Sequence, residues 1–314
     1  MVLRKTLIVA VALCMLARSP GEAQSPGRAL VPLLVAPIGS TDMTPFFYAL
    51  RQGMFERAGL DVTVQQVPSG AASTTAVVGG AVNIGFSNML ALSIARQKGI
   101  PVELIAPGVE YDTAAPNVAL LVAAASPIKN AKNLEGKVVG VTGLHDLLAV
   151  ATRAWLDKAG ADSSQVKFVE MPPGTMSEAL KSSRVDAVAV YEPFMGQIKA
   201  AGGRVIGKPY DAIGARFVNA AWFALGPWAD RHRDAAIRFA RVISQAAAYT
   251  NVHYDELIPL VSSFSKIAPE TLAQMVHVRV PPSVTPALIQ PVIDLSAKYH
   301  EIPAAFPAQE MLIR

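Results

Sequence analysis

An internal repeat constrains the fold of this chain more than any other feature of its sequence. The run VPLLVAPIGS, residues 31–40, has the pattern of a buried strand that ends in a glycine turn, and GKVVGVTGLHD, residues 136–146, matches it. A helical pattern follows each run, and both helices end in Ala-Gly, at Ala58–Gly59 and Ala159–Gly160. Glycine at that place predicts a left-handed helix cap. The chain therefore contains two similar units.

The correspondence continues through the rest of both units. Further strands, each preceded by a helix, are expected in matching order in the first unit (residues 61–70, 82–88 and 100–107) and in the second (165–174, 185–193 and 203–209). Each unit thus reads β-α-β-α-β-α-β. This alternation predicts an α/β fold of two Rossmann-like lobes, each with a parallel sheet that helices cover on both faces.

Two strand-like segments connect the units. Residues 118–127 lead into the second unit and residues 217–226 follow it, so we expect them to pair as a two-stranded hinge. From Asp230 onward the pattern is mostly helical, and this tail is expected to pack on the first lobe. The predicted organisation is lobe I from residues 28–119 and 217–314, and lobe II from residues 120–216.

Polar residues at strand ends indicate where a ligand binds. In open α/β sheets ligands lie beyond the carboxyl ends of the strands, where helix N-termini offer unpaired N–H groups. Ser87–Asn88 and Tyr191–Glu192 end corresponding strands of the two units, so we expect both pairs to face one cleft between the lobes. The alternative is that Ser87 and Asn88 only cap the next helix.

Three segments carry a resemblance to a known family. They are residues 53–88 with the pattern G-x-F-x-x-x-G-L-x-V, residues 132–143 with L-x-G-K-x-V, and residues 182–194 with V-D-A-x-x-x-x-E-P. The chain resembles the periplasmic substrate-binding proteins of the nitrate, sulfonate and taurine type, a group that includes binders of thiamine pyrimidine precursors. The resemblance covers about residues 30–225. It implies a type II periplasmic binding protein fold and delivery of a solute to the permease of an ABC importer.

Candidate ligand contacts follow from the expected strand ends. Alternatives are helix capping for the polar residues of the first loop and for Asp146, an ordinary turn for residues 69–71, and core or hinge packing for Phe46, Tyr111 and Trp222. The candidates are Ser40, Thr41, Asp42, Phe46, Ser69, Gly70, Ala71, Ser87, Asn88, Tyr111, Gly143, His145, Asp146, Thr175 with Gly174, Tyr191, Glu192 and Trp222.

The charges among these candidates limit the solute. Asp42, Asp146 and Glu192 would repel a simple anion, and no arginine occupies a predicted strand-end turn. The site therefore favours an organic solute that is nitrogen-bearing or aromatic. A sulfonate is the alternative, because Glu192 belongs to a motif that relatives with different ligands share, and it also fits a structural ion pair.

The N-terminus has the pattern of a secretory signal peptide over residues 1–23. Arg4 and Lys5 precede an apolar run that ends at Leu16, and small residues at Gly21 and Ala23 predict cleavage after Ala23. Cys14, the one cysteine, lies within this leader, and a lipid-modified cysteine is its competing interpretation. We expect a periplasmic, monomeric protein.

Other functional classes have little support in the sequence. The formal charge of +4 is not clustered with aromatic residues, which argues against nucleic-acid binding, and the histidines lack metal-ligand spacing. No metal and no cofactor are expected. The predicted function is a solute receptor without chemistry. Two alternatives remain: a periplasmic sensor subunit, and an enzyme of pyrimidine synthesis or the menaquinone pathway with His145 and Asp146 as its acid–base pair.

Overall fold

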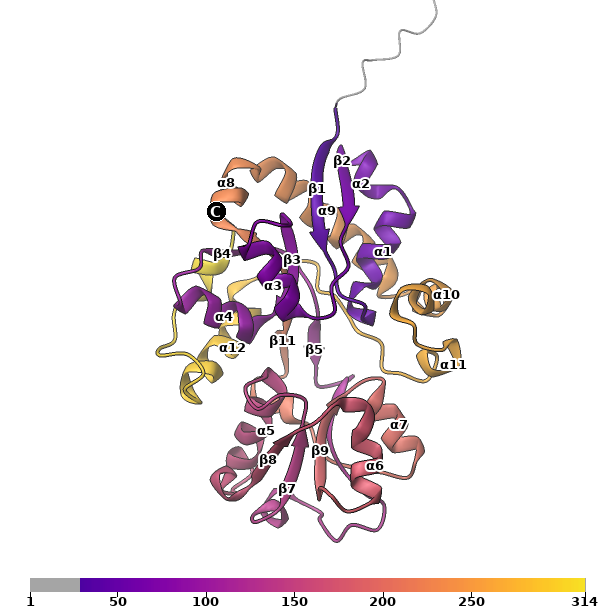
Figure 1. Cartoon of the computed structure of the whole chain (residues 1–314), viewed down its shortest axis with the longest axis vertical. Helices are drawn as coiled ribbons and strands as arrows, with labels where there is room; N and C mark the ends of the chain where they lie inside the picture. The colour runs from indigo at the N-terminus through magenta and orange to yellow at the C-terminus, as the bar shows by residue number, and fades with distance from the viewer. Residues whose placement is uncertain (1–28, 314) are drawn as a thin grey trace, which may run out of the picture.

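Two five-stranded sheets form two lobes (Figure 1) in the computed structural model, which describes residues 29–313. The strand order is β2-β1-β3-β12-β4 in lobe I and β8-β7-β9-β6-β10 in lobe II. Lobe I contains β1 (Val31–Ala36), β2 (Leu60–Val64), β3 (Ile84–Asn88), β4 (Val102–Pro107) and β12 (Ala220–Leu225). Lobe II contains β6 (Val118–Val122), β7 (Val138–Val141), β8 (Lys167–Glu170), β9 (Ala187–Tyr191) and β10 (Arg204–Gly207).

The helices alternate with the strands as the repeat predicts. Lobe I has α1 (Thr44–Arg51), α2 (Met54–Arg57), α3 (Gly70–Val78) and α4 (Met89–Gln97). Lobe II has α5 (Leu147–Lys158), α6 (Met176–Lys181) and α7 (Phe194–Ala200). Gly59 after α2 has φ = 75° and Gly160 after α5 has φ = 80°, which confirms the two left-handed caps.

The sheets are mixed, which corrects the expectation of parallel sheets. Strand β12 runs antiparallel to both β3 and β4, and β6 runs antiparallel to both β9 and β10. The physical reason is the route of the chain. A parallel neighbour needs a long crossover connection, usually a helix, whereas β6 and β12 each follow a short extended link from the other lobe. Their direction in the sheet is therefore reversed.

The hinge consists of different strands from those predicted. Strand β5 (Glu110–Asp112) pairs antiparallel with β11 (Arg216–Val218), and this two-stranded ribbon joins the lobes (Figure 1). Residues 118–122 and 220–225, expected to pair with each other, instead lie inside the sheets of lobe II and lobe I as β6 and β12. Both are almost fully buried and apolar, so burial in a sheet core outweighs pairing as an exposed ribbon.

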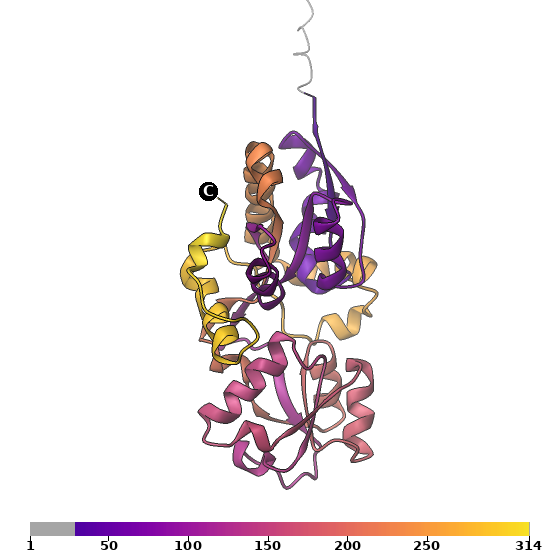
Figure 2. The same cartoon turned by 60° about the vertical axis from the view of Figure 1, so that its left-hand side comes forward.

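The C-terminal helices cover lobe I and reach the hinge (Figure 2). Helix α9 packs against α1 and β4, while α12 packs against α4, the hinge strand β11 and the edge of α5 in lobe II. These helices are α8 (Gly226–Arg231), α9 (Arg233–Thr250), α10 (Tyr254–Ser265), α11 (Pro269–Leu272) and α12 (Pro286–Lys298). None of the helices between residues 29 and 313 is both long and apolar enough to cross a membrane.

Candidate ligand-binding site

A cavity of about 420 Å³ lies between the two lobes beside the hinge. This volume is within the range of small-molecule sites, which favour interfaces between domains. The wall is formed by the loop after β1, by the end of β9 and the start of α7, and by part of the C-terminal tail. The two chain segments that cross between the lobes complete it. Its residues are Ile38, Gly39, Ser40, Thr41, Asp42, Val109, Asn117, Val118, Tyr191, Glu192, Pro193, Phe194, Tyr210, Asn219, Ser265, Ile267 and Val278.

Lobe I contributes a buried carboxyl group to this cavity. After β1 the chain turns through Ser40, whose backbone is extended, into a single 3-10 turn at Thr41–Met43 that precedes α1. Asp42 lies in this turn. Burial raises the pKa of Asp42 to about 6, although the Ser40 hydroxyl and the backbone N–H of Asp42 partly offset the effect. The carboxylate form therefore has few of the donors that it needs.

Lobe II contributes a second carboxyl group and two aromatic rings. Tyr191 ends β9 and is 41% exposed, and its ring meets that of Phe194 edge to face at 5.9 Å. Burial raises the pKa of Glu192, while the backbone N–H groups of Gly196 and Val276 lower it in part. Oε2 of Glu192 accepts the Gly196 N–H at 2.9 Å. Glu192 is thus held at the start of α7.

The electrostatic field in the cavity is negative. Burial raises the pKa of Tyr191, and the charges of Asp146 and Asp42 raise it further. Tyr210 on the wall shows the same influence, because burial followed by the charge of Asp146 raises its pKa. None of the residues that line the cavity is lysine, arginine or histidine. The cavity therefore favours donors and positive charge over anions.

Asn117 and Asn219 are among the lining residues that the sequence analysis did not predict. Each stands directly before an apolar run, NVALLV and NAAWFAL, which become the antiparallel strands β6 and β12. The signal was present in these two matching runs. The carboxyl-end rule does not find it, because the rule applies to residues that follow parallel strands and these two precede antiparallel strands.

The predicted pairing of Asn88 with Glu192 across one cleft does not occur. Asn88 Oδ1 accepts the Ala91 N–H at 2.8 Å and caps α4, and Asn88 is not among the lining residues. Ser87 beside it is 1% exposed. The strand ends of β3 and β9 are equivalent in the fold, but β12 pairs alongside the end of β3 and brings Asn219 toward the cavity instead.

Other predicted contacts also lie outside the cavity wall. At the turn after β2, Ser69 Oγ accepts the Ala72 N–H at 3.2 Å and caps α3, and Gly70 and Ala71 form the first turn of that helix. In lobe II, Thr175 donates to the Pro172 carbonyl at 2.8 Å. The alternatives of helix capping and an ordinary turn therefore apply at these positions, because their polar groups form hydrogen bonds with the nearby backbone. The lining set excludes Ser69, Gly70, Ala71, Gly143, Gly174 and Thr175.

Of the four predicted aromatic contacts, Tyr191 lines the cavity, whereas Phe46, Tyr111 and Trp222 are core residues. Phe46 is fully buried and its ring lies 5.0 Å from that of Trp222, which is 2% exposed. Tyr111 is fully buried in the hinge beside Tyr210 and Phe217, and its hydroxyl donates to Asp211 at 2.7 Å. Packing around these large rings leaves them no surface toward the cavity.

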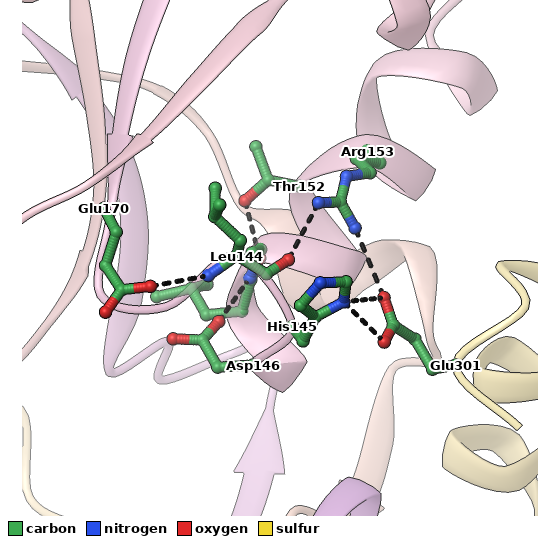
Figure 3. A network of polar contacts seen from close by, with 9 residues as sticks. Leu144, His145, Asp146, Thr152, Arg153, Glu170 and Glu301 are labelled. Carbon is green, nitrogen blue, oxygen red and sulfur yellow. Dashed lines mark hydrogen bonds and ion pairs between the residues drawn. The ribbon is translucent and has the colours of Figure 1, made fainter.

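Figure 3 shows that the adjacent His145 and Asp146 do not form an acid–base pair. Asp146 accepts the Ala149 N–H at 2.7 Å and caps α5. His145 points away from it, and its Nδ1 lies 3.0 Å from Oε2 of Glu301 in the C-terminal tail. Neither residue lines the cavity. The enzyme alternative thus loses the pair on which it was based.

Glu301 instead links the two lobes through His145 and Arg153, and these contacts are called the clasp below. His300 takes the left-handed conformation after α12, and the Glu301 N–H donates to the Ser296 carbonyl, so the turn fixes Glu301 on lobe I. Arg153 of α5 donates to Glu301 at 3.4 Å, in addition to the contact with His145 (Figure 3). One turn away, the Tyr299 hydroxyl donates to Asp157 of α5 at 2.6 Å.

Replacing Glu301 with glutamine is expected to loosen this clasp. The side chain is 9% exposed, so loss of its charge should lower the free energy of unfolding by about 1 kcal/mol and widen the distribution of inter-lobe distances. Spin-label distance measurements and thermal unfolding check both effects. The control is Glu310→Gln, because Glu310 pairs with Arg96 at 3.3 Å within lobe I. Equal distance distributions in the two variants would contradict the role of the clasp.

A strap from lobe I, residues 275–280, crosses to lobe II on another side. Val276 packs against the apolar cluster of α6 and α7, and Val278 lines the cavity. The carbonyl of Arg279 then accepts the N–H of Glu110 in the hinge at 2.9 Å. The strap therefore contacts lobe II, the cavity and the hinge in succession.

No group of three or more His, Cys, Asp and Glu side chains in residues 29–313 is arranged to hold a metal ion. The predicted signal peptide and Cys14 lie outside the described residues.

Comparison with known proteins places the chain in a family. The family model described as NMT1/THI5 like matches residues 40–256, more than half of the chain. A putative binding protein of Brucella abortus is 24% identical over 225 residues, which cover 70% of this chain and 66% of that protein, just under two thirds of its length. A putative aliphatic sulfonates-binding protein of Escherichia coli is 24% identical over 247 residues, 76% of this chain and 75% of that one.

Solved structures show the same fold at low sequence identity. The periplasmic aliphatic sulphonate binding protein SsuA of Escherichia coli has a TM-score of 0.76 at 19% identity, covering 90% of this chain and 97% of SsuA. The nitrate-binding protein NrtA of Synechocystis has 0.71 at 15%, covering 89% and 84%. The desulfurization enzyme DszB, at 0.67 and 13%, covers 90% and 96%, so the fold also supports catalysis. The chain belongs to the NMT1/THI5-like family and has the fold of the periplasmic binding proteins.

Proposed function

We propose that this protein is the solute-binding receptor of an ABC importer and that it binds a small organic solute bearing N–H donors. The observation that carries the proposal is the cavity between the lobes, whose wall contains two carboxyl groups and several aromatic rings but no lysine or arginine. Ionised Asp42 and Glu192 attract a nitrogen-bearing group, and Tyr191 and Phe194 offer ring surface to an aromatic one. The solute is held without chemistry.

A donor-bearing solute fits this cavity better than the ligands in the names of similar proteins. Nitrate and sulfonates need positive groups or many N–H donors around their oxygens. Here burial raises the pKa of both carboxyl groups, although the charge of Lys199 partly offsets the effect at Glu192. Adding an anion would increase that cost, whereas a cation would lower it.

Binding by closure of the lobes agrees with the architecture. The hinge is a ribbon of two three-residue strands, which is short enough to bend while the two sheets remain rigid. The cavity draws its wall from both lobes, so a solute there stabilises the arrangement in which they approach. We propose the two lobes, divided at β5 and β11, as the moving bodies.

The proposal includes export and a membrane partner. The signal peptide expected over residues 1–23 would direct a monomeric mature protein to the periplasm, where it would deliver its solute to the permease of the importer. Because the match spans just under two thirds of the Brucella relatives, the partner and the transport role belong to the proposal.

A thermal-shift comparison of two matched probes tests the ligand class. Benzamidinium and benzoate have similar shape, but the first presents N–H donors and positive charge and the second presents negative oxygens. At a hundredfold excess over Kd, a ligand that binds only the folded state adds about 2.7 kcal/mol of stability. We expect benzamidinium to raise Tm by several degrees and benzoate to leave it unchanged. A larger shift with nitrate, benzenesulfonate or benzoate would reject the proposed class of solute.

A further inference from the structure

The strap of residues 275–280 is held by lobe I at both of its ends. At one end Met275 is buried in the apolar core of lobe I. At the other end Asn251 Nδ2 donates to the Val280 carbonyl at 2.8 Å, and the Val280 N–H donates to Asn251 Oδ1 at 3.1 Å. Between the ends, the ring of His277 stacks on that of Tyr254 in α10, with the centroids 3.8 Å apart. The strap therefore belongs to lobe I and is fixed to it.

Val276 is the point at which this strap touches the core of lobe II. Its half-buried side chain packs against an apolar cluster that includes Met195 and Ile198 of α7. In the described part of the chain, every other member of this cluster belongs to lobe II. Apolar burial is favourable in proportion to the area that is removed from water. This contact therefore stabilises the arrangement in which the two lobes are close together.

The strap lies between the cavity and a second groove of about 420 Å³, which α7 and α11 line. Val278 lines the cavity and Val276 lines the groove, while Glu192 and Pro193 line both. The Val276 N–H acts on Glu192 there, because it partly offsets the rise in the pKa of Glu192 that burial causes. A shift of the strap away from lobe II would join the two spaces and remove the wall that Val278 supplies.

We propose that Val276 is a positioning residue for solute binding: its contact with lobe II keeps the strap against the cavity and holds the lobes at the separation in which both form the wall. Val276 does not itself line the cavity, so it acts through Val278 and through the distance between the lobes. The inference rests on the proposed function, because it assigns a role in binding at the same cavity. Together with the clasp at α5, Val276 gives the lobes two separate contacts.

Val276→Asp tests this contact with the largest expected effect. Aspartate places a charge against an apolar cluster and in the same groove as Glu192, so the lobes should separate. Spin labels at the exposed positions Ser263 in α10 and Lys181 in α6 should report longer distances in the ligand-free protein. Calorimetry should show an affinity for benzamidinium that is lower by about tenfold or more, and stopped-flow measurements should assign the loss to faster dissociation.

Further variants separate positioning from a general loss of stability. Val276→Ile keeps the apolar contact and should match the wild type in both measurements, whereas Val276→Ala should lower the affinity by about threefold and lengthen the distances. Val278→Ala removes only a wall residue, so it should lower the affinity without changing the inter-lobe distances. Val252→Asp, at a position of lobe I that is 70% exposed, should change neither quantity.

The outcomes separate this proposal from the proposed function. If Val276→Asp folds with the inter-lobe distances and the affinity of the wild type, the proposal is wrong while the receptor stands. If Val276→Ala lowers Tm but changes neither quantity, Val276 has only a packing role and the proposal is overturned, even where Val276→Asp does not fold. If the wild type responds to no probe, the proposed function fails, and the distances in the ligand-free variants still decide whether Val276 holds the lobes together.

Discussion

Replacing Asp42 with asparagine is expected to lower the affinity for benzamidinium at pH 7 by about a hundredfold. The carboxylate of Asp42 lines a cavity whose wall contains no cationic residue, so a bound cation supplies the partner that the protein itself lacks. Asparagine keeps the size and one oxygen but removes the charge. Calorimetric titration at pH 7 measures the loss.

Asp42 should also make the stability of the ligand-free protein depend on pH, and its raised pKa determines the direction. The pKa of Asp42 is raised from 3.8 to about 6. Between these two pH values the folded ligand-free protein holds a proton on Asp42 that the unfolded chain has released. The stability that this proton gives is fully present below pH 3.8 and is lost as pH rises through 6. At neutral pH the loss is on the order of 3 kcal/mol. Asp42→Asn should therefore raise the Tm of the ligand-free protein at pH 7 and flatten its change between pH 4 and 6.

Binding should change with pH in the opposite direction. The cation pairs with the ionised carboxylate, so the affinity of the wild type should increase as pH rises through about 6, and the affinity of the variant should change much less. The matched control is Asp61→Asn, because Asp61 is exposed on β2 and is not among the residues that line the cavity. If Asp42→Asn behaves like the control in both measurements, Asp42 does not contact the solute.

Replacing Phe46 with alanine is expected to destabilise the protein by about 3 to 5 kcal/mol. The Phe46 ring is fully buried and lies within 5.5 Å of the rings of Phe47, Phe55 and Trp222, so alanine leaves a large cavity under α1. The sequence predicted Phe46 as a ligand contact, with core packing as the alternative. Denaturant unfolding measures the loss of stability, and titration of the protein that remains folded should give an unchanged affinity for benzamidinium.

Tyr191→Ala provides the matched comparison with the reverse outcome. Tyr191 is 41% exposed at the cavity, so its removal should lower affinity while the free energy of unfolding changes by less than about 1 kcal/mol. If the Phe46→Ala protein folds normally but loses affinity, Phe46 contacts the solute after all.

Much of the fold was predictable because its signals are local. Strands and helices of both units follow from apolar periodicity, and Gly59 and Gly160 adopt the predicted left-handed caps. The first loop of the site was predictable for the same reason. Ser40, Thr41 and Asp42 follow a buried strand that parallel strands flank on both sides, so the carboxyl-end rule applies there, and all three line the cavity.

The same rule failed where strand direction depends on distant partners. It assigned Asn88 to the cleft, yet β12 arrives beside β3 after more than a hundred intervening residues and places Asn219 there. His145 shows the same limit, because its partner Glu301 is 156 positions away in the sequence. No pattern near either residue records such a contact.

The sequence by itself determined the two repeated α/β units, the lobe loop that carries Asp42, and the acidic character of the strand ends, because hydrophobic periodicity and residue charge act within a few residues. Tertiary structure alone decided which strands form the hinge, which polar residues cap helices and which face the cavity. Those outcomes depend on competition for burial and hydrogen bonds among segments that meet only when the chain is folded.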